Sequence, residues 1–248
     1  MLQRPGPAPG AGTVPRTPSL RPVPRPTADE PVVRPDGGSV DRPAAGSLGR
    51  ASDGAVPRVG VVAGRADLAT AERAAARFLH ALGIPTTSES LRDTPGRMAR
   101  AYAELFSPRP FDLTTFPNDE GYDELVLARS IPLRSVCEHH LLPLVGTAHV
   151  GYLPGGRILG LSKLARVVEF FARRPQVQER LTRQIADWLQ GQLEPAGVGV
   201  VVEAEHTCMT LRGVLATGSR TVTSTLLGSL REDARARAEF MMLAGLSR

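Results

Sequence analysis

The chain has 248 residues, 42% of them apolar, and a formal net charge of +5, so length alone permits one large domain or two small ones. Residues 1–66 hold nine arginines and five acids and account for four of the five positive charges, which makes the basic balance weak support for nucleic-acid binding. No apolar run approaches the roughly 18 residues of a spanning helix, and the N-terminus lacks a signal-peptide pattern.

We therefore expect a cytoplasmic protein, with reduced cysteines, that binds neither nucleic acid nor membrane.

Residues 1 to about 65 differ in composition from the rest of the chain. Twelve of the 22 prolines precede residue 61, and the first aromatic residue is Phe78. Such a segment cannot bury enough apolar surface to offset its ordering entropy, so we predict a disordered tail at residues 1–65 and a folded domain at 66–248. A basic tail could dock on a membrane or a nucleic acid, but a solvated extension is the favoured interpretation.

The first half of the folded part is predicted to hold two helices and two strands. The helices span residues 67–82 and 93–106, the second with Thr94 as its cap and Pro95 at its first position. Turn residues predict a loop at 107–122. Strands are predicted at 123–133 and 147–154.

The second half of the folded part repeats this pairing of elements. Helices are predicted at 161–175, with Ser162 as cap, and from Pro175 onward. Strands follow at 197–213 and 220–228, and a helix at 232–246 closes the chain. Since helices and strands come in pairs rather than in strict alternation, we predict an α+β fold with an antiparallel sheet.

Both cysteines of the chain have histidine neighbours. Cys137 and His140 have the C-x-x-H spacing with which a short loop brings two side chains onto one metal ion. If residues 197–213 form a strand, His206, Cys208 and Arg212 point to the same face. This pairing of cysteine with histidine favours a metal site over packing alone.

The number of ligands separates the interpretations of this site. Two thiolates and one imidazole leave the fourth position of a tetrahedral Zn²⁺ for water, which is typical of catalysis. A structural site would take His139 or His206 as its fourth ligand. Without a metal, the two cysteines would either form one disulfide or remain as two inert thiols. His80 and His149 lie far from either cysteine in sequence and are expected to be structural histidines.

Two predicted helices begin with polar residues that suit a ligand. Lys163 is the single lysine of the chain, and it lies with Ser162 and Arg166 in a first turn, where backbone N–H groups favour an anion. A solvated surface lysine is the competing interpretation. Gln178 and Glu179 open the next helix. The helix dipole alone favours an acid there, although a carboxylate could also accept two hydrogen bonds from a guanine edge.

Five segments together resemble the GTP cyclohydrolase I family in order and spacing. They are "TPGR" at 94–97, "CEHH" at 137–140, "GLSKLARVVEFFARRPQVQERLT" at 160–182, "HTCMTLRG" at 206–213 and "TVTSTLLG" at 221–228. The resemblance covers about residues 67–246 and excludes the tail. Ser130 and Thr207 depart from the pattern without removing a ligand or a proton donor.

The resemblance implies a zinc enzyme that opens the imidazole ring of GTP, releases formate and rearranges the ribose to give 7,8-dihydroneopterin triphosphate, the first step of pterin and tetrahydrofolate biosynthesis. It also implies the tunnelling fold, in which subunits pool antiparallel sheets into a barrel with helices outside. The implied assembly is a homodecamer with its sites at subunit interfaces.

The resemblance also assigns roles to single residues. The implied zinc ligands are Cys137, His140 and Cys208, with water in the fourth position. The implied proton carriers are His139, at the imidazole nitrogen, and His206, in later steps near the ribose. The implied substrate contacts are Ser162, Lys163, Arg166 and Arg212 for ribose and triphosphate, Arg97 from a neighbouring subunit, and Glu179 with Gln178 for guanine.

Rival interpretations use the same residues differently. The nitrile reductase of queuosine synthesis shares the implied fold and uses a cysteine nucleophile with NADPH, but it would not need the second cysteine of "HTCMTLRG". Fold relatives with a three-histidine zinc site are disfavoured by the two cysteines. A structural zinc module whose partner binds the tail is the non-enzymatic alternative.

Overall fold

A computed structural model describes residues 58–59 and 66–246. The chain divides into two units, Met1–Ser47 and Leu48–Arg248, and every described residue belongs to the second unit. The predicted tail therefore lies outside the described residues, except for Arg58–Val59, which form the short strand β1.

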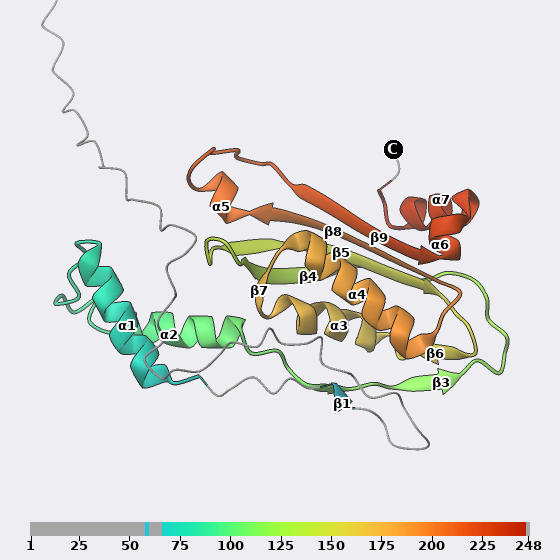
Figure 1. The fold of residues 1–248 in the computed structure, drawn as a ribbon, viewed down its shortest axis with the longest axis horizontal. Coiled ribbons are helices and arrows are strands. Elements are labelled where there is room, and N and C mark those ends of the chain that lie inside the picture. Colours follow the sequence, from blue (N-terminus) through green and yellow to red (C-terminus); the bar gives the residue numbers. More distant parts are fainter. Residues whose placement is uncertain (1–57, 60–65, 247–248) are drawn as a thin grey trace, which may run out of the picture. The chain divides into compact units, whose positions relative to one another are not determined.

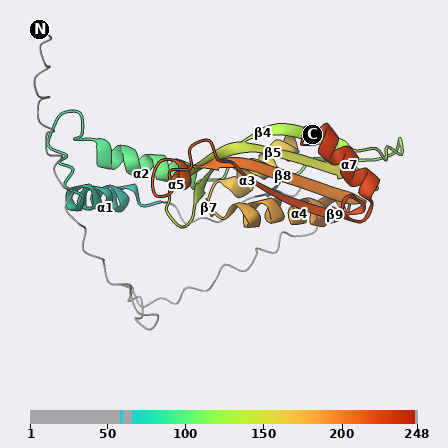
Figure 2. The ribbon, with the colours of Figure 1, turned by 90° about the horizontal axis from the view of Figure 1, so that it is seen from above.

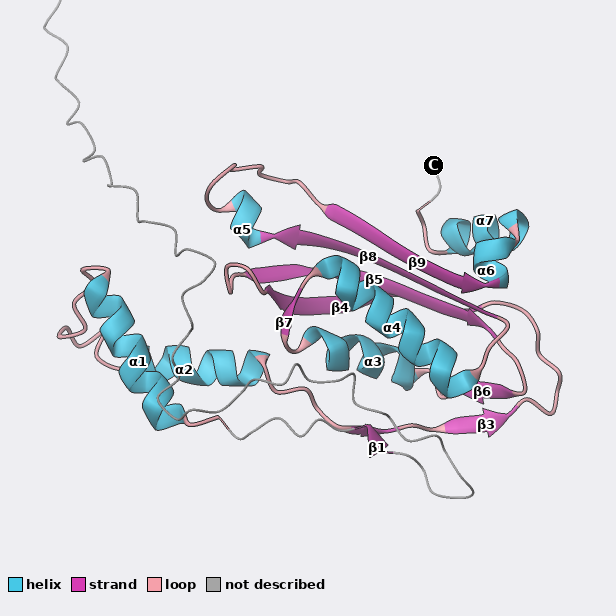
Figure 3. Ribbon diagram, in the orientation of Figure 1, coloured by secondary structure: helices cyan, strands magenta, loops and turns pink. Residues whose placement is uncertain are grey.

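Helices and strands are mixed along the chain, which agrees with the predicted α+β class (Figure 3). The helices are α1 (Leu68–Ala81), α2 (Thr94–Leu105), α3 (Ser162–Ala172), α4 (Gln178–Leu193), α5 (Thr207–Thr210), α6 (Ser229–Glu232) and α7 (Ala234–Leu243). After β1 the strands are β2 (Phe111–Asp112), β3 (Thr115–Pro117), β4 (Val126–Cys137), β5 (Pro143–Leu153), β6 (Arg157–Leu159), β7 (Pro175–Gln176), β8 (Gly197–His206) and β9 (Thr221–Gly228).

The main sheet has five strands in the order β7-β4-β5-β8-β9 (Figure 1). The long strands pair antiparallel, as predicted, whereas the two residues of β7 pair parallel with the end of β4. A register shift between Ala128 and Ile131 leaves Ser130 with a φ of 57°, which marks a β-bulge in β4. Two smaller sheets pair β1 with β2 and β3 with β6.

The two faces of the main sheet pack against different helices. Helices α3 and α4 run along one face, where the larger hydrophobic core includes Val200 and Val202 of β8 (Figure 2). Val201 points the other way and packs with Leu230 and Phe240 of α6 and α7. The alternation along β8 follows from the two-residue period of a strand.

Three helices begin at other residues than predicted. Thr94 and Ser162 are the first helical residues rather than caps, and the residues before them make no side-chain capping bond. Helix α4 starts at Gln178 because Pro175 and Gln176 are paired with β4. Strand pairing therefore decides where this helix begins.

Two further segments were predicted as single elements and are divided in the structure. The predicted loop at 107–122 contains β2 and β3. The predicted terminal helix is broken at Asp233, whose side chain accepts a hydrogen bond from the Arg235 N–H at 2.7 Å and caps α7.

Over the described part of the chain, none of the helices is both long enough and apolar enough to span a membrane.

Candidate metal centre

Cys137 is the last residue of β4 and begins the turn that leads into β5. Its N–H donates to the Leu142 carbonyl at 2.9 Å, and its own carbonyl accepts from the Leu141 N–H at 2.8 Å. Leu141 has a φ of 53°, the left-handed conformation that reverses the chain here. This turn places His139 and His140 next to the sulfur of Cys137.

The second half of the site comes from the end of β8. In the register of β5 with β8, His206 lies opposite Leu144, and the Thr207 hydroxyl donates to the Pro143 carbonyl at 2.6 Å. The prediction that His206, Cys208 and Arg212 share one face of a strand is wrong, because β8 ends at His206 and α5 follows. The helical turn of α5 carries the Cys208 side chain inward, where it is buried.

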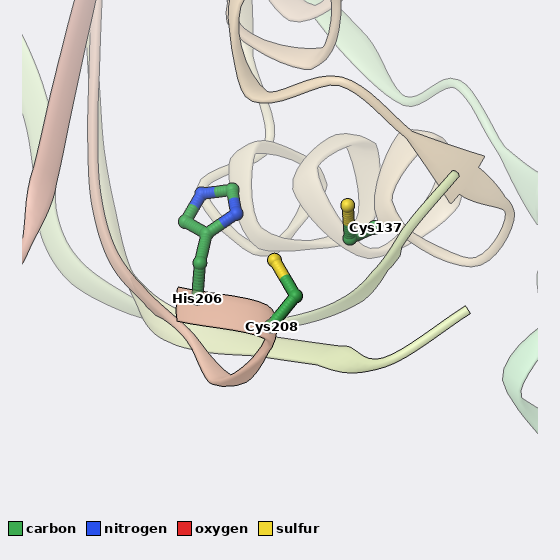
Figure 4. Close-up of side chains that lie close together, drawn as sticks. All are labelled: Cys137, His206 and Cys208. Atoms are coloured by element: carbon green, nitrogen blue, oxygen red, sulfur yellow. The ribbon is translucent and has the colours of Figure 1, made fainter. Parts of the chain in front are cut away.

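These two segments bring together three side chains that could hold a metal ion (Figure 4). Ligand atoms of Cys137, His206 and Cys208 all lie within 4.8 Å of one another. The Nδ1 atoms of His139 and His140 are each 3.7 Å from the Cys137 sulfur. Sulfur and nitrogen ligands of one tetrahedral Zn²⁺ are separated by about 3.5 Å. The arrangement therefore has the dimensions of a zinc site with more candidate histidines than it needs.

The chemistry of the donors also fits zinc. Both cysteines are free and buried. Burial and the neighbouring Cys137 thiol raise the pKa of Cys208, and burial lowers the pKa of His206 against the opposing effect of Glu179. Thiolate sulfur and imidazole nitrogen are the donors that Zn²⁺ selects, and a bound cation would favour the thiolate forms.

Gln178 supports the site through a bond that the sequence did not reveal. Its Oε1 is 2.7 Å from Nε2 of His206, and its side chain is buried, at 2% exposed. The sequence did hold a signal, because Gln178 stands on the apolar stripe of α4, three residues before Leu181 and seven before Ile185. A contact of Gln178 with guanine, as predicted, would compete with His206 for the same side-chain amide.

Glu138 forms a second supporting contact that the sequence did not reveal. Its carboxylate pairs with the guanidinium of Arg180 on α4, and this hydrogen bond holds the pKa of Glu138 below its usual range. The Arg180 Nε also donates to Oε1 of Gln176 at 3.0 Å. The turn after β4 is thereby joined to α4.

Two of the predicted substrate contacts lie beside the metal centre. Glu179 follows Gln178 in the first turn of α4 and is exposed. Arg212 follows α5 and donates to the Cys208 carbonyl at 3.2 Å. Both side chains are therefore within the same part of the molecule as the cysteines.

The predicted phosphate contacts at the start of α3 lie at the other end of the sheet. The last residue of α3, Ala172, accepts a hydrogen bond from Ser135 near the end of β4, at 2.6 Å. The segment entering α3 is held by Tyr152, whose hydroxyl accepts from the Leu159 N–H at 2.8 Å. Tyr152 is eight residues along β5 from Leu144, or roughly 26 Å. One chain therefore does not bring Ser162, Lys163 and Arg166 to its own cysteines.

Arg97 also makes its contacts away from the cysteines. It lies in α2, where it donates to the Ser90 carbonyl at 2.9 Å and pairs with Asp93 at 3.7 Å. Helix α2 touches the metal-site turn through Tyr102, whose hydroxyl donates to the Leu141 carbonyl at 3.0 Å.

Comparison with known proteins gives a consistent result. Residues 71–245 match the family model described as GTP cyclohydrolase I. The chain is 54% identical to GTP cyclohydrolase 1 of Mycobacteroides abscessus over 182 residues, which cover 71% of this chain and 89% of the relative. Identity is 54% over 185 residues to the enzyme of Streptomyces avermitilis, covering 73% and 92%, and 51% over 166 residues to that of Aquifex aeolicus, covering 67% and 90%.

A similarity to one solved structure is much weaker. The archaeosine synthase QueF-like protein in its apo form aligns with 42% of this chain and 93% of its own, at 19% identity and a TM-score of 0.36. That score is too low to carry an argument about the fold.

Proposed function

The chain belongs to the GTP cyclohydrolase I family, and we propose that it is a zinc enzyme that converts GTP into 7,8-dihydroneopterin triphosphate and formate. The observation that carries the zinc dependence is the convergence of both cysteines of the chain with a histidine, within 4.8 Å. Buried free thiols that face an imidazole in this way are typical of a metal centre.

We assign the zinc ligands to Cys137, His140 and Cys208. The resemblance to the family implies this set, and the Nδ1 of His140, like that of His139, is 3.7 Å from the Cys137 sulfur. Zinc, when bound, supplies the positive charge that makes water nucleophilic at neutral pH. Three protein ligands leave one position for that water.

His139 and His206 are then free to move protons. His139 lies in the same turn as the ligands, with its Nδ1 3.7 Å from the Cys137 sulfur. The ring of His206 borders both sulfurs. Imidazole is the side chain that most often serves as a general acid or base, so either ring can accept a proton from water and return it to a leaving nitrogen.

We propose that two side chains of the same chain bind the substrate. Glu179 accepts hydrogen bonds from the guanine edge, since a carboxylate offers two acceptor oxygens to two parallel donors. Arg212, next to Cys208, binds the phosphate or ribose end of GTP. Gln178, predicted from the resemblance as a guanine contact, is bonded to His206 and supports the site from behind.

A second copy of the chain supplies the remaining contacts. The start of α3, with Ser162, Lys163 and Arg166, offers N–H groups and two cations to a triphosphate. Within residues 66–246 neither Lys163 nor Arg166 takes part in an ion pair. Because these residues lie far from the cysteines of their own chain, we place them, and Arg97, in the sites of neighbouring subunits.

We also propose a homodecamer whose sheets form a barrel, as the resemblance to the family implies. Strand β9 is the last strand of the main sheet, and an edge strand can pair with another chain. On the face opposite α3 and α4, strands β5 and β8 present the partly exposed polar side chains of Thr147 and Glu203. A polar face suits the water-filled interior of a barrel.

A single preparation tests the proposed activity. Purified protein should contain about one zinc ion per subunit and should convert GTP into formate and a pterin that fluoresces after oxidation and dephosphorylation. The Cys208→Ser variant, carrying an oxygen where the sulfur stands, should lose both the metal and the turnover. Zinc-loaded wild-type protein that leaves GTP unchanged would contradict the activity and favour a structural zinc module.

A further inference from the structure

The side-chain amide of Gln178 is held in one orientation by groups that can only accept hydrogen bonds. Its Nε2 donates to the carbonyl of Val202 at 3.1 Å and to that of Thr221 at 2.9 Å. The Thr223 hydroxyl is a third neighbour, at 3.2 Å. With the amide reversed, its own oxygen would face two carbonyl oxygens in a buried place, an arrangement that costs free energy without forming a bond.

This orientation decides which nitrogen of His206 carries the proton. Because Nε2 of Gln178 faces the carbonyls, Oε1 faces His206, at 2.7 Å. An amide oxygen can only accept, so Nε2 of His206 must be the donor. In a neutral imidazole the other nitrogen, Nδ1, then has the free lone pair.

The free lone pair points into the metal centre. In Figure 4 the ring nitrogen bonded to Cγ of His206 faces Cys208 and Cys137, whereas the other nitrogen points away from them. These three side chains have their ligand atoms within 4.8 Å of one another. A proton on Nδ1 would turn this acceptor into a donor facing two sulfurs.

We propose that Gln178 is a positioning residue that holds the proton of His206 on Nε2, so that Nδ1 accepts hydrogen bonds or protons at the metal centre. The inference rests on the proposed function for its catalytic consequence, but the tautomer itself is a property of the folded protein. It gives Gln178 a role in turnover rather than in guanine binding. The same tautomer serves whether Nδ1 accepts a proton from water or binds the metal directly.

The tautomer can be read directly in the intact protein. We would record nitrogen NMR spectra of zinc-loaded protein labelled with ¹⁵N-histidine, and assign His206 among the five histidines of the chain by its loss in His206→Asn. Wild-type protein should show a protonated Nε2 and an unprotonated Nδ1. A proton on Nδ1 of the wild-type protein would overturn the proposal without the need for any Gln178 variant.

Gln178→Met removes the amide and keeps the length of the side chain. We expect a fraction of His206 to carry its proton on Nδ1 and kcat for GTP to fall about 10- to 100-fold, as for other groups that orient a metal-site histidine. KM should stay within about twofold, because no substrate contact is removed.

Thr182→Val is the matched control. Thr182 is buried one turn along α4, donates to the Gln178 backbone carbonyl at 2.8 Å and lies 2.6 Å from the Thr223 hydroxyl. The change disturbs the same polar cluster but leaves the bond to His206, so the wild-type tautomer and kcat should remain.

The other outcomes separate the two roles of Gln178. An unchanged tautomer in Gln178→Met would mean that another group fixes the proton and would overturn the proposal, as would a raised KM with normal kcat, which indicates a substrate contact. If wild-type protein does not turn over GTP, the proposed function fails, whereas the NMR spectra still decide the role of Gln178.

Discussion

Glu138, directly after Cys137, forms an ion pair with Arg180 of α4. The Glu138 N–H also donates to the carbonyl of Gln176 at 3.0 Å, and Arg180 donates to the side chain of Gln176. The turn that carries His139 and His140 is thus tied to the start of α4, which in turn carries Gln178. Two segments about 40 residues apart in sequence meet at the metal centre through this pair.

We predict that Arg180→Met loosens this turn more than it destabilises the fold. The pair is partly exposed, so the free energy of unfolding should fall by no more than about 1 kcal/mol. A ligand turn that is no longer held should lower zinc affinity or kcat about tenfold or more. Urea unfolding, zinc analysis and the GTP assay on one preparation measure all three quantities.

Arg183→Met provides the comparison for Arg180→Met. Arg183 pairs with Asp187 on the same helix at 2.6 Å and is similarly exposed. Its loss should have a comparably small effect on unfolding and none on zinc content or turnover. Equal losses of activity in the two variants would show that the turn does not depend on Arg180.

The histidines of the metal centre should separate into ligands and proton carriers. We predict that His140→Ala loses zinc, whereas His139→Ala and His206→Ala keep it and lose turnover about 100-fold or more, the usual effect of removing a general acid or base. Zinc content and rate are measured on the same samples. If His206→Ala lost zinc and His140→Ala retained it, His206 would be the zinc ligand and His140 the proton carrier.

Most long elements could be predicted because their side-chain patterns are strongly periodic. Helix α1 was predicted at 67–82 and spans Leu68–Ala81, and β9 was predicted at 220–228 and spans Thr221–Gly228. The strand ends were less predictable, because they depend on partners. Strand β5 begins at Pro143 rather than residue 147, since Pro143 pairs with Val136 of β4.

The failed prediction for Cys208 has the same cause. Pairing of β8 with β9 stops at Ala204, and pairing with β5 stops at His206. Beyond His206 the described residues show no further strand pairing for this segment, and the chain turns into α5. The role of Gln178 was hidden for a related reason, because its partners are backbone carbonyls of Val202 and Thr221, 24 and 43 residues away. A side-chain pattern does not show which backbone groups will face it.

The contact between α7 and the sheet depends on the absence of a side chain at Gly199. A Cβ added there would lie 2.8 Å from the ring of Phe240, which is fully buried. We predict that Gly199→Ala lowers the free energy of unfolding by about 1 to 3 kcal/mol, the usual effect of overpacking. Urea unfolding at fixed protein concentration measures the change.

Gly191→Ala tests whether the effect at Gly199 is steric. Gly191 lies in α4, and an added Cβ would meet nothing within 4 Å. Alanine is the better helix former, so this variant should be more stable by about 0.5 to 1 kcal/mol. Destabilisation of both variants by the same amount would exclude the contact with Phe240 as the cause.

His149 should make the stability of the fold depend on pH. The side chain is 7% exposed, and within the described residues its Nδ1 has no hydrogen-bond partner. Burial lowers the pKa of His149, Arg129 of β4 lowers it further, and Glu203 of β8 opposes both. The folded protein therefore favours the neutral ring, whereas the unfolded chain binds a proton near the ordinary value of 6.5.

The sign of the pH effect follows from this difference in proton binding. Above the unfolded pKa both states are neutral at this residue, and the contribution of His149 to stability is complete. As the pH falls below about 6.5, the unfolded state takes up the proton first, and the free energy of unfolding decreases until the folded pKa is reached. His149→Gln removes the titrating group. Its free energy of unfolding should therefore decrease less than that of the wild type between pH 7.5 and 5.5, a range of about two pH units around the unfolded pKa. Parallel curves for the two proteins in urea unfolding would show that His149 is already charged, or already partnered, in the folded state.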